Sequence, residues 1–139
     1  ICDGVHLAPD VIRMAMSSAG PKRIALVTDA MSATGQPDGD YILGSLPVKV
    51  VDGRARLLAA DGSLGAIAGS TLTMGRAVEF VTSVVGIPLG QVAVMAATTP
   101  AKLHGLDEVG VIEEGHWADL CLTDAKGHLV RVIHRGEAV

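Results

Sequence analysis

The heptapeptide IALVTDA at residues 24–30 decides the fold prediction, because it places a carboxylate directly after a short apolar run. Such a run followed by a turn is typical of a buried strand in a parallel sheet. The loop that follows ends at Gly35. In parallel α/β folds functional groups lie at the carboxyl ends of the strands, so Asp29 is a candidate acid, base or metal ligand. From this segment alone, the alternative is an aspartate that only satisfies the backbone of its own turn.

Composition limits the function classes. The chain has 139 residues, 49% of them hydrophobic, which is enough for one ordinary domain with a buried core. The net charge is −4 and the eleven Lys and Arg residues are scattered, so neither nucleic acid nor an anionic membrane is an expected partner. The two cysteines, Cys2 and Cys121, match no metal-binding or redox spacing, and no secretory signal or long apolar span is seen. The expected compartment is therefore the cytoplasm.

Residues 1–6 are predicted to be the end of a second buried strand, and the segment after them favours a helix that begins near Pro9 and ends at Gly20. Together with residues 24–29 this makes a strand, helix, strand unit. A right-handed crossover brings the carboxyl ends of both strands to one edge, so His6 and Asp29 are expected at the same mouth. The alternative for His6 is a surface or packing histidine.

The rest of the chain alternates between β and helical character. Residues 37–66 contain short β-type runs separated by Asp-Gly turns, which predict hairpins. Ser70 is the expected N-cap of a helix that ends before Gly86, although a Gly-Ser turn of this kind can also hold an anion. Two further helices are predicted at residues 88–98 and 99–105. Residues 108–139 return to β character, and both β regions are expected to form one sheet.

Four motifs carry a resemblance that spans essentially the whole chain. They are DGVH at residues 3–6, LVTDAM at 26–31, AGSTLTM at 68–74, and TTPAKLHGL at 98–106 with GVIEEGHWADL at 110–120. Together they resemble the C-terminal part of the N-acetylglucosamine-6-phosphate deacetylases, a family of the amidohydrolase superfamily. The first three, taken together, resemble these deacetylases more than their relatives. The last is similar to the closing segment of many amidohydrolases, so it indicates the superfamily and not the substrate.

The resemblance implies an α/β fold, namely the C-terminal portion of a metal-dependent (β/α)8 TIM-barrel hydrolase with a small β-sandwich domain. This chain would supply the last two strands and helices of the barrel and part of the sandwich. Residues 1–36 would be the last βα units of the barrel and 37–66 a β-sandwich or hairpin segment. Residues 67–107 would be the C-terminal helices of the barrel, and 108–139 a second β-sandwich segment.

The resemblance also implies site residues. Asp29 matches the catalytic aspartate of the family, and it is a possible secondary metal ligand. His6 matches a histidine that contacts the phosphosugar, while Ile67, Ala68 and Gly69 match a loop that touches substrate. The main metal ligands, a glutamate and two histidines from earlier strands, have no counterpart because the chain begins after them. The resemblance also implies a divalent metal, zinc or iron, in the complete enzyme. It implies a homodimer as well.

The implied function is hydrolysis of the acetamide of N-acetylglucosamine 6-phosphate to glucosamine 6-phosphate and acetate in amino-sugar catabolism. A metal-activated water would attack, and Asp29 would act first as general base and then as general acid. One open alternative is another amidohydrolase, for example an N-acetylgalactosamine-6-phosphate deacetylase. The other is a non-catalytic truncated interaction module. The remaining histidines form no ligand cluster in sequence and are expected in structural or surface roles; they are His104, His116, His128 and His134.

Overall fold

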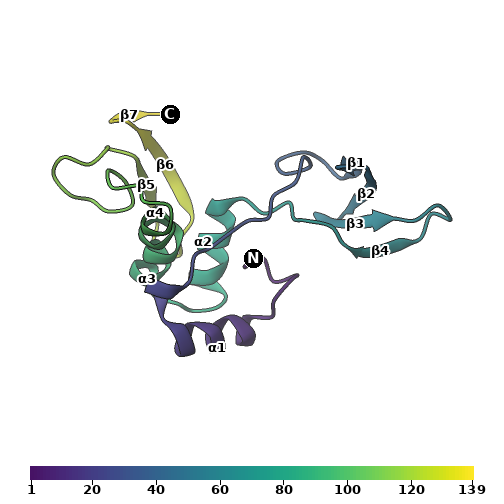
Figure 1. Ribbon diagram of the computed structural model, residues 1–139, viewed down its shortest axis with the longest axis horizontal. Coiled ribbons are helices and arrows are strands. Elements are labelled where there is room, and N and C mark those ends of the chain that lie inside the picture. The colour runs from purple at the N-terminus through teal and green to yellow at the C-terminus, as the bar shows by residue number, and fades with distance from the viewer. The chain divides into compact units, whose positions relative to one another are not determined.

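A computed structural model describes all residues from Ile1 to Val139, and the chain divides into two compact units (Figure 1). Unit 1 consists of Ile1–Val27 and Met74–Val139, and unit 2 of Thr28–Thr73. Both helices and strands are present, so the predicted α/β class is confirmed. None of the helices combines the length and apolar character that crossing a bilayer requires.

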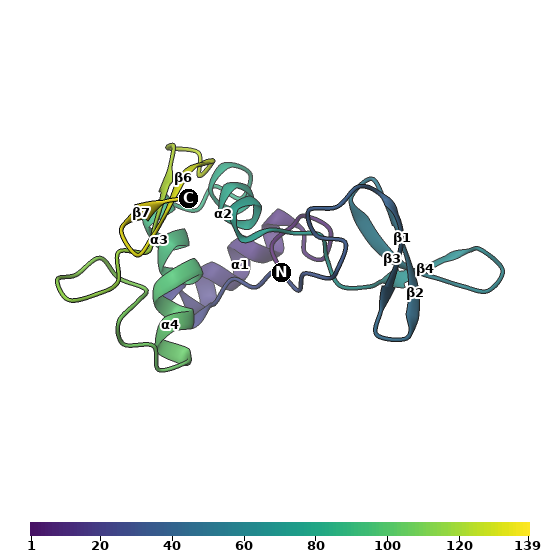
Figure 2. The same ribbon diagram turned by 90° about the horizontal axis from the view of Figure 1, so that it is seen from above.

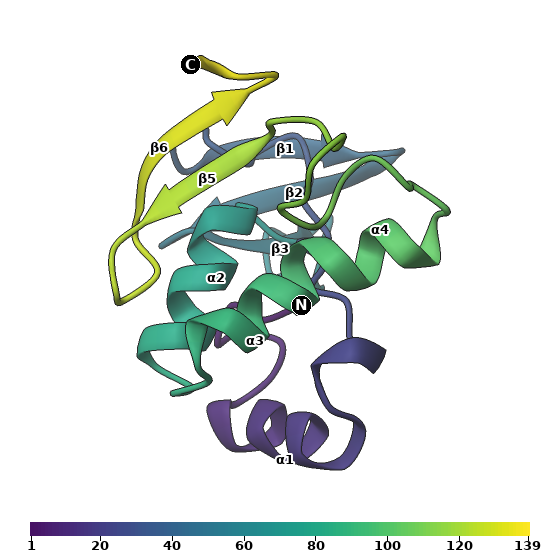
Figure 3. The ribbon, with the colours of Figure 1, turned by 90° about the vertical axis from the view of Figure 1, so that its left-hand side faces the viewer.

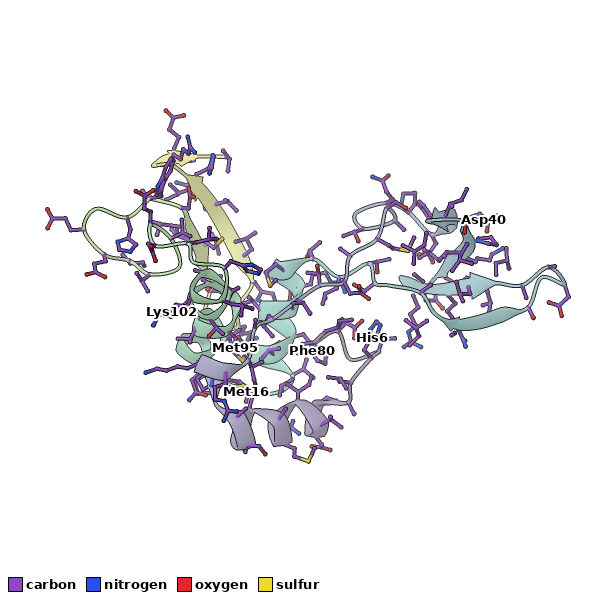
Figure 4. The ribbon with its side chains drawn as sticks, in the orientation of Figure 1. His6, Met16, Asp40, Phe80, Met95 and Lys102 are labelled. Carbon is purple, nitrogen blue, oxygen red and sulfur yellow. The ribbon has the colours of Figure 1, made fainter.

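Unit 1 contains all the helices. They are α1 (Pro9–Ala19), η1 (Pro21–Arg23), α2 (Met74–Ser83), α3 (Leu89–Ala93), η2 (Val94–Thr98) and α4 (Thr99–Leu103). The limits of α1 confirm the prediction: Pro9 occupies its first turn, and Gly20 ends it with a φ of 73° that favours glycine. Its apolar face packs against α2, α3 and η2 in a core that includes Met16, Val81 and Met95 (Figure 4).

The segment from α3 to α4 is one unbroken helical run, so the prediction of two separate helices is wrong. Pro100 lies inside this run, although proline lacks a backbone N–H and its ring crowds the carbonyl four residues earlier. The five residues of η2, immediately before α4, form a π-type turn. A wider turn at this point relieves the crowding and lets the helix continue past the proline.

Unit 1 also carries a three-stranded antiparallel sheet with the order β5 (Leu120–Thr123), β6 (Leu129–His134), β7 (Glu137–Ala138). Figure 3 shows β5 and β6 beside α2. The β5–β6 turn touches this helix, because a Cβ built on Gly127 would lie only 3.2 Å from the Cα of Glu79. The β character predicted for residues 110–112 is wrong, since they form no strand.

Unit 2 is built on an antiparallel meander of β1 (Gly39–Leu43), β2 (Leu46–Val51), β3 (Arg54–Leu58) and β4 (Leu64–Ile67), seen from above in Figure 2. The predicted hairpins are thus confirmed. At the β2–β3 turn, Asp52 and Gly53 both have positive φ, as a two-residue hairpin turn of this hand requires. One face of the sheet packs in a core with Met31, Ala33 and Ala68.

The two strands predicted at residues 1–6 and 24–29 are not formed. A strand of a parallel sheet needs neighbouring strands that pair with its N–H and C=O groups along its length, and neither segment belongs to a sheet here. The N–H of Leu26 instead donates to the carbonyl of Met95 at 3.0 Å. Next to Asp29, Ala30 forms a single isolated parallel bridge with Ser70.

Two further predictions need correction. Ser70 is not the N-cap of α2, which begins at Met74, because the bridge to Ala30 holds Ser70 in extended chain. The two β regions do not form one sheet, since β1–β4 and β5–β7 are hydrogen-bonded separately. Asp-Gly turns favour pairing of neighbouring strands, so each region closes on itself.

Candidate functional site

Asp29 lies in unit 2, on an extended segment that leads into the loop at residues 31–36. Asp29 is exposed to solvent, and its backbone φ is 53°, in the left-handed region. An aspartate tolerates this conformation better than most residues do, yet it costs of the order of 1 kcal/mol and persists only where neighbouring groups impose it. The hydrogen bonds around Asp29 show which groups do so.

A second segment pairs with the chain on both sides of Asp29. The backbone N–H of Ser70 donates to the carbonyl of Asp29 at 2.7 Å, and the Ser70 carbonyl accepts the N–H of Met31 at 2.9 Å. The hydroxyl of Ser70 donates to the carbonyl of Thr28 at 2.5 Å. We call this arrangement of residues 28–34 with residues 68–72 the Asp29 clamp.

Gly69 allows the two segments of the clamp to approach. Its φ is 65°, and a Cβ at this position would lie 3.2 Å from the Asp29 carbonyl oxygen and 3.4 Å from the Cβ of Met31. A side chain would therefore be both strained and crowded. Ala68 is buried, and its N–H bonds to the Ala55 carbonyl at 3.0 Å, which ties the clamp to β3. Ile67, at the end of β4, is 42% exposed.

His6 lies in unit 1, in a tight turn built by Asp3. One carboxylate oxygen of Asp3 accepts the N–H groups of Val5 and His6, both at 2.9 Å, and the other lies 2.8 Å from His6 Nδ1. Partial burial opposes ionisation of Asp3, but the backbone N–H of His6, its imidazole and the N–H of Val5 outweigh this and lower the pKa of the carboxyl. With Nδ1 donating to this carboxylate, His6 Nε2 is the ring nitrogen left for a ligand.

The turn that carries His6 rests on α2. Gly4 has a φ of 74°, and a Cβ there would lie 2.9 Å from the Cζ of Phe80. Figure 4 shows Phe80 on α2 between α1 and the segment that bears His6. Residue 4 of the chain therefore favours glycine chiefly because of this positive φ, and a side chain there would also displace the Phe80 ring.

Of the other histidines, two form ion pairs at the surface, whereas the Nδ1 of His116 is buried and has no hydrogen-bond partner. His128 Nδ1 lies 2.8 Å from Asp124 and its Nε2 lies 3.2 Å from Glu79, so it joins the β5–β6 turn to α2. His134 Nδ1 pairs with Asp119 at 3.0 Å. The chain contains no group of three His, Cys, Asp or Glu side chains that could hold a metal ion. Structural zinc needs four ligands and catalytic zinc three, so the single carboxylate of Asp29 does not fit a metal centre by itself.

The structure brings together Asp29, Ala68 and Gly69 of the predicted site, with Ile67 adjoining them, and it holds His6 in a separate, locally built turn. Sequence reasoning missed two residues. Asp3 could have been found from its position three residues before His6, a spacing at which a carboxylate reaches an imidazole across a turn. Ser70 has the residue type and position of a helix cap, and no local signal reveals that it pairs with Asp29.

The sequence model of the amidohydrolase family matches residues 6–139, so the chain belongs to this family, whose members are generally metal-dependent hydrolases. The N-acetylglucosamine-6-phosphate deacetylase of Vibrio furnissii is 35% identical over all of this chain, which spans 34% of that protein. A putative N-acetylgalactosamine-6-phosphate deacetylase of Escherichia coli K12 is 33% identical over 99% of this chain and 79% of that protein.

Two solved structures are similar over 99% of the chain. The N-acetylglucosamine-6-phosphate deacetylase of Thermotoga maritima matches with a TM-score of 0.86 and 40% identity, over 37% of its own length. That of Mycobacterium smegmatis, in complex with N-acetyl-D-glucosamine-6-phosphate, matches with a TM-score of 0.85 and 37% identity, over 36% of its length. This chain thus spans about a third of the Vibrio furnissii relative and of both structures.

Proposed function

We propose that the chain is the part of an N-acetylglucosamine-6-phosphate deacetylase that carries the catalytic acid and base. The complete enzyme hydrolyses the acetamide of N-acetylglucosamine 6-phosphate to glucosamine 6-phosphate and acetate. The observation that carries this proposal is Asp29, an exposed carboxylate held in a left-handed conformation by the Asp29 clamp. Likeness along 99% of the chain to deacetylases of this name supports the choice of substrate.

The proposed assembly places residues 1–36 and 67–107 in the last part of a (β/α)8 barrel and residues 37–66 and 108–139 in a β-sandwich domain. The segments at residues 1–6 and 24–29 would become strands once the neighbouring barrel strands pair with them. The remaining strands come from outside these 139 residues, in a longer chain or a partner. The complete enzyme is a homodimer of the cytoplasm.

In this enzyme Asp29 takes a proton from the attacking water and later returns it to the departing amine. Such base and acid catalysis typically contributes about 10²–10⁴-fold in rate. Because Asp29 is exposed, its carboxylate is accessible to both the attacking water and the departing amine. A divalent metal ion, zinc or iron, is held mainly by residues outside this chain and polarises the acetamide carbonyl when bound. Asp29 can contribute only one ligand to it.

His6 binds the substrate through Nε2, because Asp3 occupies Nδ1. As a neutral ring it accepts from a sugar hydroxyl, and as a cation it donates to the phosphate. The backbone of residues 67–69 forms a further contact with the sugar. Gly69 has no side chain to obstruct this approach.

The Escherichia coli relatives favour one second candidate, deacetylation of N-acetylgalactosamine 6-phosphate. Amine release by the complete enzyme, in which a longer chain or a partner supplies the remaining barrel strands, separates the two candidates when both epimers are offered beside unphosphorylated N-acetylglucosamine with added Zn²⁺ or Fe²⁺. We expect the highest kcat/KM with N-acetylglucosamine 6-phosphate. Preference for the galactose epimer would reassign the substrate. A folded assembly of this kind that neither binds nor turns over any of the three compounds would favour the non-catalytic module.

A further inference from the structure

We propose that Ser70 is a positioning residue that fixes the backbone conformation of Asp29 and thereby the direction of its carboxylate. The inference rests on the proposed function of Asp29 and extends it to a residue of the neighbouring segment. Ser70 is the only buried polar or charged residue of the chain, with 4% of its surface exposed. A buried hydroxyl is costly unless its hydrogen bonds are made, so its partners show what it does.

Every polar atom of Ser70 is engaged. Its hydroxyl donates to the Thr28 carbonyl at 2.5 Å and accepts the N–H of Leu72 at 3.1 Å. Its N–H donates to the Asp29 carbonyl at 2.7 Å. Its carbonyl accepts the N–H of Met31 at 2.9 Å and the hydroxyl of Thr34 at 3.2 Å.

Two of these bonds control the two backbone torsions of Asp29. The carbonyl of Thr28 belongs to the peptide plane before the Asp29 Cα, whose orientation sets φ. The carbonyl of Asp29 belongs to the plane after it, whose orientation sets ψ. Ser70 thus holds both planes, one with its hydroxyl and one with its N–H.

This control matters because Asp29 is not in a conformation that it would adopt alone. A backbone with a φ of 53° has a higher energy than one in the right-handed or extended region. The backbone of Asp29 should therefore relax when the groups that impose this φ are removed. A rotation about φ moves the Cβ of Asp29 and with it the carboxylate. The hydroxyl of Ser70 therefore acts on proton transfer without touching the substrate.

Ser70→Ala removes both hydroxyl bonds, the one donated to the Thr28 carbonyl and the one accepted from the Leu72 N–H, and retains the backbone bond to Asp29. We expect kcat for N-acetylglucosamine 6-phosphate to fall by about 10- to 100-fold, since a misplacement of about 1 Å has effects of this size. KM should change less than threefold. Ser70→Thr keeps a hydroxyl and should restore most of kcat. The matched control is Ser63→Ala in the β3–β4 turn of the same unit, which removes an exposed hydroxyl bond to Asp61 and should leave kcat unchanged.

A second readout does not require turnover. The three-bond HN–Hα coupling of Asp29 reports its φ, and the exchange rate of the Met31 amide reports its bond to the Ser70 carbonyl. Both should change in Ser70→Ala and return in Ser70→Thr. If Ser70→Ala does not fold, Thr34→Val removes only one bond to Ser70 and should give smaller changes of the same kind.

An Asp29 coupling and a kcat that both stay at the wild-type value in Ser70→Ala would overturn the inference. A rise in KM alone, with kcat preserved, would overturn the inference as well. Asp29→Asn distinguishes this failure from failure of the proposed function. If Asp29→Asn keeps full turnover, Asp29 is not the acid and base, and the inference that Ser70 positions a catalytic group falls with it.

Discussion

Asp29 and His6 are held in place by different means. Asp29 depends on Ser70, whose hydroxyl bonds to a carbonyl 42 residues earlier in the chain, whereas His6 depends on Asp3, three residues away. The conformation of His6 is therefore fixed by a local turn, whereas that of Asp29 forms only when two segments that are distant in sequence pair. Substitutions in residues 68–72 should therefore affect Asp29, while His6 should respond to changes in its own turn and in the contact of that turn with Phe80.

The largest effect on stability is expected from Gly69→Ala, which tests the close approach within the Asp29 clamp. The added Cβ would lie 3.2 Å from the Asp29 carbonyl at a φ of 65°. We expect the free energy of unfolding to fall by about 1–2 kcal/mol and kcat to fall with it. Urea unfolding and the amine-release assay measure the two quantities.

The matched control for this substitution is Gly65→Ala in β4. A Cβ there would meet Leu57 at an ordinary 3.5 Å, and Gly65 does not have a positive φ. This variant should be as stable as the wild type or more so. Equal losses at positions 65 and 69 would contradict the clamp.

Asp3→Asn sharpens the other side of the comparison. The substitution presents an amide to His6 Nδ1 and removes the charge that the imidazole faces. We expect the KM for the phosphosugar to rise about tenfold, an energetic effect of about 1.4 kcal/mol, and kcat to change little. Nitrogen NMR of the imidazole should report a changed tautomer. Asp124→Asn disturbs the similar turn at His128 and should leave KM unchanged; a rise there of the same size would contradict a specific role for Asp3.

The same carboxylate gives a pH dependence of stability. The pKa of Asp3 is lower in the folded chain than in the unfolded one, because its hydrogen bonds to His6 and Val5 outweigh the cost of partial burial. Its contribution is therefore present above the unfolded pKa of about 4 and is lost as pH falls through the folded value. Urea midpoints between pH 6 and pH 2 should decline less steeply in Asp3→Asn. Parallel curves would contradict this prediction.

The smallest effect is expected at His128, the exposed counterpart of His6. Its hydrogen bond to Asp124, aided by the charges of Asp124 and Glu79, raises its pKa. The stabilisation is full below the unfolded pKa of about 6.5 and is lost as pH rises through the folded value. Between pH 6 and pH 8.5 the wild type should lose slightly more thermal stability than His128→Gln. A larger loss of thermal stability in His128→Gln than in the wild type would contradict a raised pKa of His128.

The elements that could be predicted from the sequence are those with local signals. Pro9 and Gly20 mark the ends of α1, and the Asp-Gly pair at 52 and 53 marks a hairpin turn that the structure confirms. The hydrophobic periodicity of the sequence does not predict the π-type turn that lets the helix continue past Pro100, because the residues before the proline adopt the wider turn.

The elements that could not be predicted depend on distant partners. Residues 24–29 have the composition of a buried strand, but a strand is defined by its neighbours, and here the Leu26 N–H bonds to the Met95 carbonyl. Ser70 has the residue type and position of a helix cap, yet its hydroxyl bonds to Thr28. For the site, Asp29, His6 and residues 67–69 were predicted from family motifs, and their roles stay predictions until they are tested by substitution.

The catalytic role of Asp29 is tested most directly by kcat for N-acetylglucosamine 6-phosphate in the complete enzyme and in its Asp29→Asn variant, measured by amine release at saturating substrate with the divalent metal added. The substitution preserves the size of the side chain and removes its capacity to accept a proton. We predict a loss of at least about 10²-fold in kcat with substrate affinity largely retained. Turnover at the wild-type rate in Asp29→Asn would contradict the account.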